Sequence, residues 1–374
     1  RNEEEINPKY LYGAFFDMRL KVLYITFTDF GELSSGSSVR PFRMYNALVN
    51  LGLDVKLLEG QQNRRKERRL KVKKIIDWLD DNKPDICYVE PPSGPFFNQI
   101  DLKLLRKVHN MGIPIGLFYR DFYWKFPEWA WFDTPLWKRT ILTMMHKRDL
   151  KVFQKCCDVL YFTSQECFKH FDDVKFKKLG ILPPGCNEPR GEVKIGAREI
   201  FYAGGVREAD GIDDLLIALD RINKSGFRVK FNLITKREEL VHLKNSELLK
   251  SDWIEVMEAS GEALEPIYAR CDLGVLPKKR HFYMDMAISV KVLECMSHGL
   301  PMISTDCPAM ARFIQQNESG LICKEGADSI ENAILEYYTN DELYHALLEN
   351  VKKAALNNTW EKRVEQVISD LLNK

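Results

Sequence analysis

The sequence predicts an α/β protein made of two doubly wound domains, each with its own parallel sheet. Short apolar runs alternate with amphipathic helical stretches along most of the chain, a pattern typical of βαβ units. The length of 374 residues exceeds what one hydrophobic core usually supports. A segment rich in proline, at 182–190, separates the alternating pattern into two series.

The first series predicts one sheet. Its strands are short runs bounded by turn residues, and its helices repeat apolar residues at a spacing of three and four. We expect strands at 21–26, 54–58, 85–89, 114–119, 159–163 and 178–182, with helices that include 39–51 and 66–79. Strands that alternate with helices form right-handed βαβ units, and so a parallel sheet.

The second series follows the proline-rich break. Its expected strands are 199–202, 229–234, 254–257, 273–276, 301–304 and 321–323, and its helices lie near 213–222, 264–269 and 290–296. We therefore expect domains at 1–185 and 186–358. Ligands of such sheets bind beyond the carboxyl ends of the strands, which predicts a site in a cleft between the domains.

Composition excludes several functional classes. With 55 basic and 54 acidic residues, the chain has no net field for nucleic acid. The nine cysteines form no Cys-x-x-Cys pair, which favours a reducing cytoplasm over a disulfide framework or a zinc site. The seven histidines show no metal-ligand spacing, so no metal is expected. A Gly-x-Gly-x-x-Gly motif is missing after the first strand, which argues against a dinucleotide cofactor.

The segment 288–306 is the most informative part of the chain. An apolar-periodic helix carries Glu294, stops at Gly299 and turns through Pro301 into a buried strand. The start of such a helix offers free backbone N–H groups to an anion. A carboxylate one turn deeper can accept hydrogen bonds from sugar hydroxyls. The pattern suits a nucleotide-sugar diphosphate, and the alternative is an ordinary surface glutamate.

Five segments in this order resemble the GT-B glycosyltransferases, specifically family 4, the retaining nucleotide-sugar enzymes. They are 34–40, 182–185, 201–205 with 211–216, the segment 288–306, and 359–363. The resemblance covers nearly the whole chain. It implies an acceptor-side first domain, a donor-binding second domain, and a C-terminal helix at 359–374 that crosses back onto the first.

The same resemblance implies an activity. The enzyme would transfer a sugar, with retention and without a metal or cofactor, from a UDP- or GDP-type donor to a hydroxyl. The expected donor-binding residues are Gly36, Ser37, Gly204, Gly205, Arg207, Asp285, Met286, Ala287, Ile288, Ser289, Val290, Lys291 and Glu294. Two alternatives stay open: a transferase-like subunit that lost catalysis and binds a partner, and a nucleotide-sugar epimerase of the same fold.

The sequence departs from the family pattern at several of these positions. The family pairs two glutamates separated by seven residues, and here Met286 occupies the place of the first, beside Asp285. Gly205 and Asp210 stand where an Arg and a Lys usually hold the diphosphate. We expect Arg207 and Lys291 to take that role, and the alternative for Lys291 is a solvated helix surface. If neither residue binds the diphosphate, the basic residues 278–280 are the next candidates.

In the first domain, Arg120 and Asp121 correspond to a His-Asp pair of the family. With Glu294 they are the expected catalytic residues, although Arg120 and Asp121 can instead pair structurally. Ten of the twenty residues at 118–137 are aromatic, and eight of the eleven at 64–74 are basic. Both segments favour the inner face of a membrane and a glycan or lipid-linked acceptor of cell-surface polysaccharide or glycolipid synthesis. The alternative is that the aromatics fill the core and the basic block is a solvated helix face.

Overall fold

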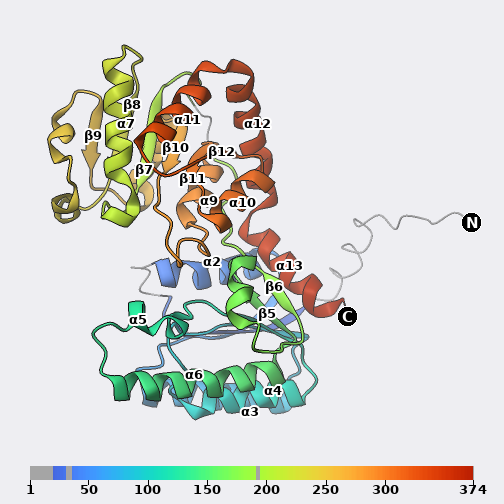
Figure 1. The fold of residues 1–374 in the computed structure, drawn as a ribbon. Helices are drawn as coiled ribbons and strands as arrows, with labels where there is room; N and C mark the ends of the chain where they lie inside the picture. The colour runs from blue at the N-terminus through green and yellow to red at the C-terminus, as the bar shows by residue number, and fades with distance from the viewer. Residues whose placement is uncertain (1–19, 31–35, 191–193, 374) are drawn as a thin grey trace, which may run out of the picture. The chain divides into compact units, whose positions relative to one another are not determined.

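A computed structural model describes residues 20–30, 36–190 and 194–373, and the chain divides into two compact units. The first unit takes the chain up to Phe162, then Phe168–Leu182, and the stretch from Trp360 onward. The second unit is Thr163–Cys167 and Pro183–Thr359. The main passage between units thus lies within the proline-rich segment, three residues before the expected boundary. Each unit has a parallel sheet flanked by helices (Figure 1).

The first unit contains a six-stranded parallel sheet in the order β2-β1-β3-β4-β5-β6. Its strands are β1 Lys21–Thr26, β2 Asp54–Leu58, β3 Ile86–Glu90, β4 Ile115–Phe118, β5 Val159–Phe162 and β6 Leu179–Ile181. Its α-helices are α2 Gly36–Asn50, α3 Arg65–Asp81, α4 Gln99–Asn110, α5 Pro127–Ala130, α6 Leu136–Cys156 and α13 Trp360–Leu372. The helices α3, α4 and α6 pack side by side along one face of the sheet (Figure 1).

The helix α13 joins the first unit although it ends the chain. Its buried residues Trp360, Val364, Val367 and Leu371 recur at helical spacing and form one face. That face packs against α2 and reaches the core tyrosines of β1, β3 and β5. The C-terminal helix therefore completes the core of the first unit.

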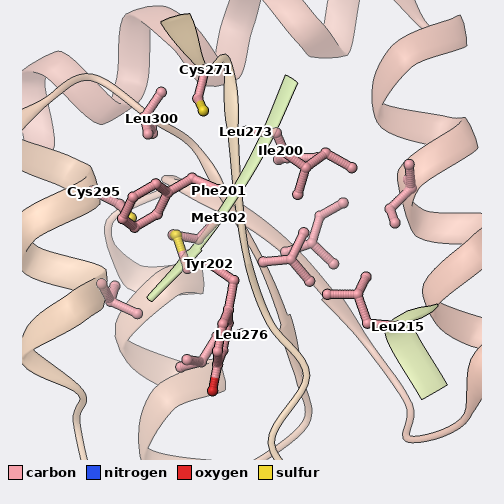
Figure 2. Close-up of a cluster of buried hydrophobic side chains, with 14 of the residues drawn as sticks. Ile200, Phe201, Tyr202, Leu215, Cys271, Leu273, Leu276, Cys295, Leu300 and Met302 are labelled. Carbon is pink, nitrogen blue, oxygen red and sulfur yellow. The ribbon is translucent and has the colours of Figure 1, made fainter. Parts of the chain in front are cut away.

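The second unit contains a parallel sheet in the order β12-β11-β10-β7-β8-β9. Its strands are β7 Glu199–Ala203, β8 Lys230–Ile234, β9 Ile254–Met257, β10 Leu273–Leu276, β11 Met302–Thr305 and β12 Gly320–Cys323. Its α-helices are α7 Ile212–Lys224, α8 Glu265–Arg270, α9 Val290–Ser297, α10 Pro308–Gln316, α11 Ala327–Thr339 and α12 Asp341–Asn357. Side chains of β7, β10 and β11 pack against those of α7 and α9 in its core (Figure 2).

The observed elements follow the predicted ones closely, and two differences have a physical cause. The strand expected at 301–304 is Met302–Thr305, because Pro301 has no N–H to give to the ladder and contributes only its carbonyl, which accepts from the Gly274 N–H. The strand expected at 114–119 ends at Phe118, since Asp121 adopts a left-handed φ of 54° and turns the chain. Among the described residues, no helix combines the length and apolarity needed to cross a membrane.

Candidate functional site

Glu294 lies just over one turn inside α9, at the end of an irregular loop, as its sequence predicts. Ser289 caps this helix, its hydroxyl accepting a hydrogen bond from the Lys291 N–H at 3.2 Å. The Glu294 carboxylate is half-exposed and accepts hydrogen bonds from Lys291 Nζ at 2.8 Å and from the Tyr268 hydroxyl at 3.3 Å. One oxygen, Oε2, takes both bonds, so the carboxylate is held in place with acceptor capacity to spare.

The Tyr268 hydroxyl is itself positioned by a stacked histidine. The rings of Tyr268 and His298 lie parallel, with centroids 3.9 Å apart and an interplanar angle of 9°. His298 is fixed by Glu294 O at 2.7 Å and Glu265 at 3.0 Å. Burial is the main cause that raises the pKa of Tyr268, so its hydroxyl stays protonated and donates to Glu294.

A pocket of about 220 Å³ opens beside the start of α9. Ala287, Ile288 and Ser289, three of the expected donor-binding residues, lie in its wall. The rest of the wall comes from Leu276, Lys278, Tyr283, Met284, Ser304, Cys307 and Met310. It lies beyond the carboxyl ends of β10 and β11, where ligands of open parallel sheets bind. Its volume fits one ring of a nucleotide sugar better than a whole ligand.

The two residues at the place of the missing family glutamate do different things. The Met286 side chain is buried, and its carbonyl accepts a hydrogen bond from Ser164 Oγ at 2.8 Å. The Asp285 carboxylate accepts two hydrogen bonds from one edge of the Arg280 guanidinium, from Nε at 3.1 Å and from Nη2 at 2.9 Å. Neither lines the pocket, so in this conformation Asp285 acts as the partner of Arg280.

The carboxyl ends of β7 and β10, where the strand order reverses, bring two loops into contact. A side chain at Gly211, whose φ is 71°, would overlap the carbonyl oxygen of Pro277. The Asp210 carboxylate pairs with Lys278 Nζ through Oδ1 and accepts from the Arg207 N–H through Oδ2 at 2.9 Å. A side chain at Gly205 would meet the same Oδ2 at 2.7 Å, which explains the glycine there. Position 210, where the family usually has a lysine, thus holds an aspartate, and its carboxylate pairs with Lys278 in the loop after the neighbouring strand β10.

The backbone of Gly204 continues β7, with its N–H donating to Ile234 O at 3.0 Å. Arg207, in contrast, turns outward. Its guanidinium forms two bonds to Glu239, at 3.2 and 3.1 Å, and these bonds raise the pKa of Arg207. Lys278, which lines the pocket, is better placed than Arg207 to meet a diphosphate. The sequence ranks Lys278 behind Arg207 and Lys291, because its pairing with Asp210 joins residues 68 positions apart in the chain.

In the first unit, Arg120 and Asp121 follow β4. Arg120 Nε lies 3.6 Å from Asp121 Oδ2, which also accepts a hydrogen bond from Ser93 Oγ at 2.7 Å. This geometry agrees with the structural alternative, in which Arg120 pairs with Asp121. Gly36 and Ser37 begin α2, whereas residues 34 and 35 of the same motif lie outside the described residues.

The aromatic segment and the basic block are partly structural. Tyr119, Phe122 and Trp124 are buried, and the Trp124 indole donates to the Tyr119 hydroxyl at 2.9 Å. Arg68, in the middle of the basic block, is fully buried and binds Asp101 at 2.9 Å. The three aromatic residues follow the core alternative, whereas the buried Arg68 departs from the expected solvated helix face. Phe132 and Trp137, at the end of the aromatic segment, are exposed.

Comparison with known proteins finds a family match within the second unit. Residues 197–340 match the family described as Glycosyl transferases group 1. A chitobiosyldiphosphodolichol beta-mannosyltransferase from Candida albicans is 26% identical over 133 residues, which is 34% of this chain. That match spans about a quarter of the relative, 27% of its length.

Solved structures match both units. Sucrose-phosphate synthase from Thermosynechococcus elongatus is 13% identical, with a TM-score of 0.62, and the match covers 94% of this chain and 98% of that one. HepE from Anabaena, in complex with UDP, is 11% identical, with a TM-score of 0.62 over 95% of this chain and 100% of that one. These likenesses establish the fold and confirm the GT-B resemblance.

Proposed function

We propose that this GT-B chain, whose second unit carries the group 1 glycosyltransferase match, transfers a sugar from a nucleoside diphosphate sugar to a hydroxyl acceptor. The observation that carries the proposal is that the features of the candidate site all fall within the residues of the family match. The family match at 197–340 contains Glu294, the α9 start, the pocket and the Asp210–Lys278 pair. The HepE structure, described as a complex with UDP, supports a uridine or related diphosphate as the donor class.

Each charged group of the site has a role in this proposal. Glu294 accepts hydrogen bonds from hydroxyls of the donor sugar or ribose through its spare lone pairs. Lys278, and Lys291 after it leaves Glu294, neutralise the diphosphate together with the N–H groups that begin α9. Stabilising the charge that grows on the leaving diphosphate is the main catalytic contribution expected, and it requires no metal.

The stereochemical course is the finer part of the proposal. Family 4 resemblance supports retention, with the acceptor attacking on the face that the diphosphate leaves. The name of the Candida relative specifies a β-linked product. The anomeric configuration of the product, read by NMR from a donor of known configuration, therefore decides between retention and inversion.

For the acceptor we propose a glycan or lipid-linked glycan, in cell-surface polysaccharide or glycolipid synthesis at the inner face of a membrane. The support is the relative's name, which describes transfer to a dolichol-linked diphosphate sugar. Asp121, after β4 in the first unit, is the acidic group proposed to meet the acceptor hydroxyl. Its backbone adopts a left-handed φ of 54°, and its carboxylate is held by a hydrogen bond from Ser93 Oγ at 2.7 Å.

The test is a panel of UDP- and GDP-sugars, each incubated with and without extracts of lipid-linked and soluble glycan acceptors. Transfer of the sugar that depends on both donor and acceptor supports the proposal. Conversion of one nucleotide sugar into another without acceptor would indicate an epimerase instead.

A transferase-like binding subunit is the second candidate. The observation that favours it is the buried Met286 at the place of a family glutamate, with Asp285 taken up by Arg280. Nucleoside diphosphate binding without transfer to any acceptor would support this candidate over the enzyme.

A further inference from the structure

The first half of α6 leaves large apolar side chains in solvent. Burial on this helix begins only at His146, and its C-terminal half packs against the first unit. Before that point a group that we name the α6 patch is exposed. Its members, with their exposed fractions, are Phe132 77%, Leu136 77%, Trp137 67%, Ile141 49% and Met144 65%.

The α6 patch is held in shape by hydrogen bonds. The Arg139 guanidinium donates to Phe132 O and to Thr134 O, each at 2.7 Å, which ties the preceding turn to the helix. The same turn is closed by the Thr134 N–H, which donates to Trp131 O at 2.8 Å. Phe132 therefore projects from an ordered turn beside Leu136 and Trp137. Preorganised apolar groups lose less entropy when they are covered by another surface.

The exposed face of α6 changes from apolar to basic along its length. Trp137, Met144 and Lys151 are separated by seven residues each, so they share one side of the helix. Lys147 and Lys155 flank Lys151 at a spacing of four, and all three lysines are exposed. None of the three forms an ion pair within the part of the chain that the structure describes. The one acidic residue of α6, Asp149, is buried and paired with Arg148.

The neighbouring helix α4 extends the positive charge. It packs against α6 and exposes Lys103 and Arg106, while its single acidic residue, Asp101, is buried with Arg68. Asp133, in the turn before α6, is the acidic group nearest in sequence to the patch. The face formed by α6 and α4 is thus apolar at one end and cationic over the rest.

We propose that the α6 patch and the lysine row Lys147, Lys151 and Lys155 form a docking surface for an anionic lipid bilayer. A helix with aromatic and aliphatic groups beside lysines lies in the plane of a bilayer, with its apolar side chains in the headgroup boundary. Trp137 has the amphipathic ring that favours this depth. The 21 residues of α6 extend about 30 Å, enough for the lysines to reach lipid phosphates while the patch is inserted.

The charge distribution favours a bilayer over a second copy of the chain. Two copies joined along the whole face in parallel would bring their lysine rows together, and like charges in contact oppose association; an antiparallel contact would leave the lysines without an anionic partner. An anionic leaflet instead attracts every lysine in the row. The inference rests on the membrane location given in the proposed function and deepens it, because it names the surface, formed by helices of the first unit alone, that meets the lipid.

Co-sedimentation of the full chain with phosphatidylcholine vesicles, with and without phosphatidylglycerol, tests the proposal. We expect binding that needs phosphatidylglycerol and weakens as salt rises from about 0.1 M to about 1 M. The Lys147→Gln, Lys151→Gln, Lys155→Gln variant should lose about fivefold in affinity for each lysine. The Trp137→Ser, Met144→Ser variant should lose about tenfold or more, and its residual binding should still depend on salt.

Matched controls come from the second unit. Val241 and Leu356 are comparably exposed, and Val241→Ser with Leu356→Ser should leave sedimentation unchanged. Lys250→Gln with Lys353→Gln controls for the loss of exposed lysines. Quenching of tryptophan fluorescence by brominated lipids should fall in Trp137→Phe while sedimentation persists, since that variant keeps an apolar ring.

Three results would overturn the proposal. One is wild-type protein that ignores anionic vesicles at low salt, and another is equal loss of binding in the control variants. The third is a dimer, seen by sedimentation velocity, that dissociates in the Trp137→Ser, Met144→Ser variant without any effect of lipid. Titration of UDP into the same variants separates this outcome from the proposed function, since their donor site is intact.

Discussion

Glu294 is the residue whose proposed role a single substitution tests most directly. Glu294→Gln keeps the helix register, and we expect transfer to lose about 1.5–3 kcal/mol because a charge-assisted bond to a donor hydroxyl becomes neutral. The measurement is kcat/KM together with donor affinity by calorimetry. Glu349→Gln is the control, since Glu349 also pairs with a lysine three residues away on a helix. Wild-type kinetics in Glu294→Gln would remove this residue from the site.

Lys278 is the second residue-scale prediction. Lys278→Met should weaken UDP binding about tenfold, because the pocket wall then loses its cation beside the diphosphate. Lys279→Met controls for the charge lost, as Lys279 pairs with Asp214 at 3.6 Å. The double variant Asp210→Lys, Lys278→Asp exchanges the charges and should recover part of the affinity. Unchanged binding in Lys278→Met, with weakening in Arg207→Ala or Lys291→Ala, would return the role to the residues that the sequence indicates.

These two residues also show what sequence can predict of a site. Glu294 and Ser289 were predictable because a local pattern, a loop followed by a capped helix, fixes them. Lys278 ranked only as a fallback, because its position depends on Asp210, which packs beside it only after β7 and β10 pair. Arg207 fits the spacing but bonds to Glu239, a partner that no local pattern reveals.

At the scale of elements, α6 carries a histidine that makes stability depend on pH. His146 stacks on Trp124 with ring centroids 5.4 Å apart, and burial, with a smaller effect of Arg148, lowers its pKa to about 4. The unfolded chain has a pKa near 6.5, so between these values the unfolded state binds the proton more readily. The stabilising effect is therefore present above about pH 6.5 and is lost as the pH falls toward 4, by about 3 kcal/mol in all.

Urea unfolding at pH 7 and pH 4.5 measures this effect. His146→Phe keeps the ring against Trp124 but cannot take a proton, so its loss of stability between the two pH values should be smaller than that of the wild type. His109→Phe, in the last turn of α4, is the control. Equal losses in wild type and His146→Phe would show that other groups cause the acid sensitivity.

The elements themselves were largely predictable, and the aromatic segment 118–137 shows the limit. Composition alone gives ten aromatic residues both a core and a membrane interpretation. The fold divides them, since Tyr119 and Trp124 pack beneath α6 while Phe132 and Trp137 remain in solvent. That division depends on where β4 ends and α6 begins, a boundary that periodicity does not fix to the residue.

At the scale of the whole molecule, the two parallel sheets followed from the alternation of strands and helices, because parallel neighbours are joined by crossover helices. Each unit has its own core, and the chain returns to the first unit at Trp360. The sequence indicated this return only through a resemblance, since an amphipathic C-terminal helix packs equally well on either sheet. The structure assigns it by the contact between α13 and α2.

Two buried tryptophans test whether the cores are energetically separate. Trp360 lies in the first core and Trp253 in the second, and both are buried. Trp360→Ala should destabilise the first unit by about 3–5 kcal/mol, the cost of a large cavity. It should leave UDP affinity unchanged, because Lys278, Lys291 and Glu294, the side chains proposed to bind the donor, all belong to the second unit. Trp253→Ala should cost the second unit a similar amount and lower UDP affinity wherever that unit begins to unfold. Calorimetric unfolding and UDP titration at the same temperatures measure both effects. A loss of UDP affinity in Trp360→Ala equal to that in Trp253→Ala would show that the two cores unfold together and that α13 supports the donor unit as well as its own.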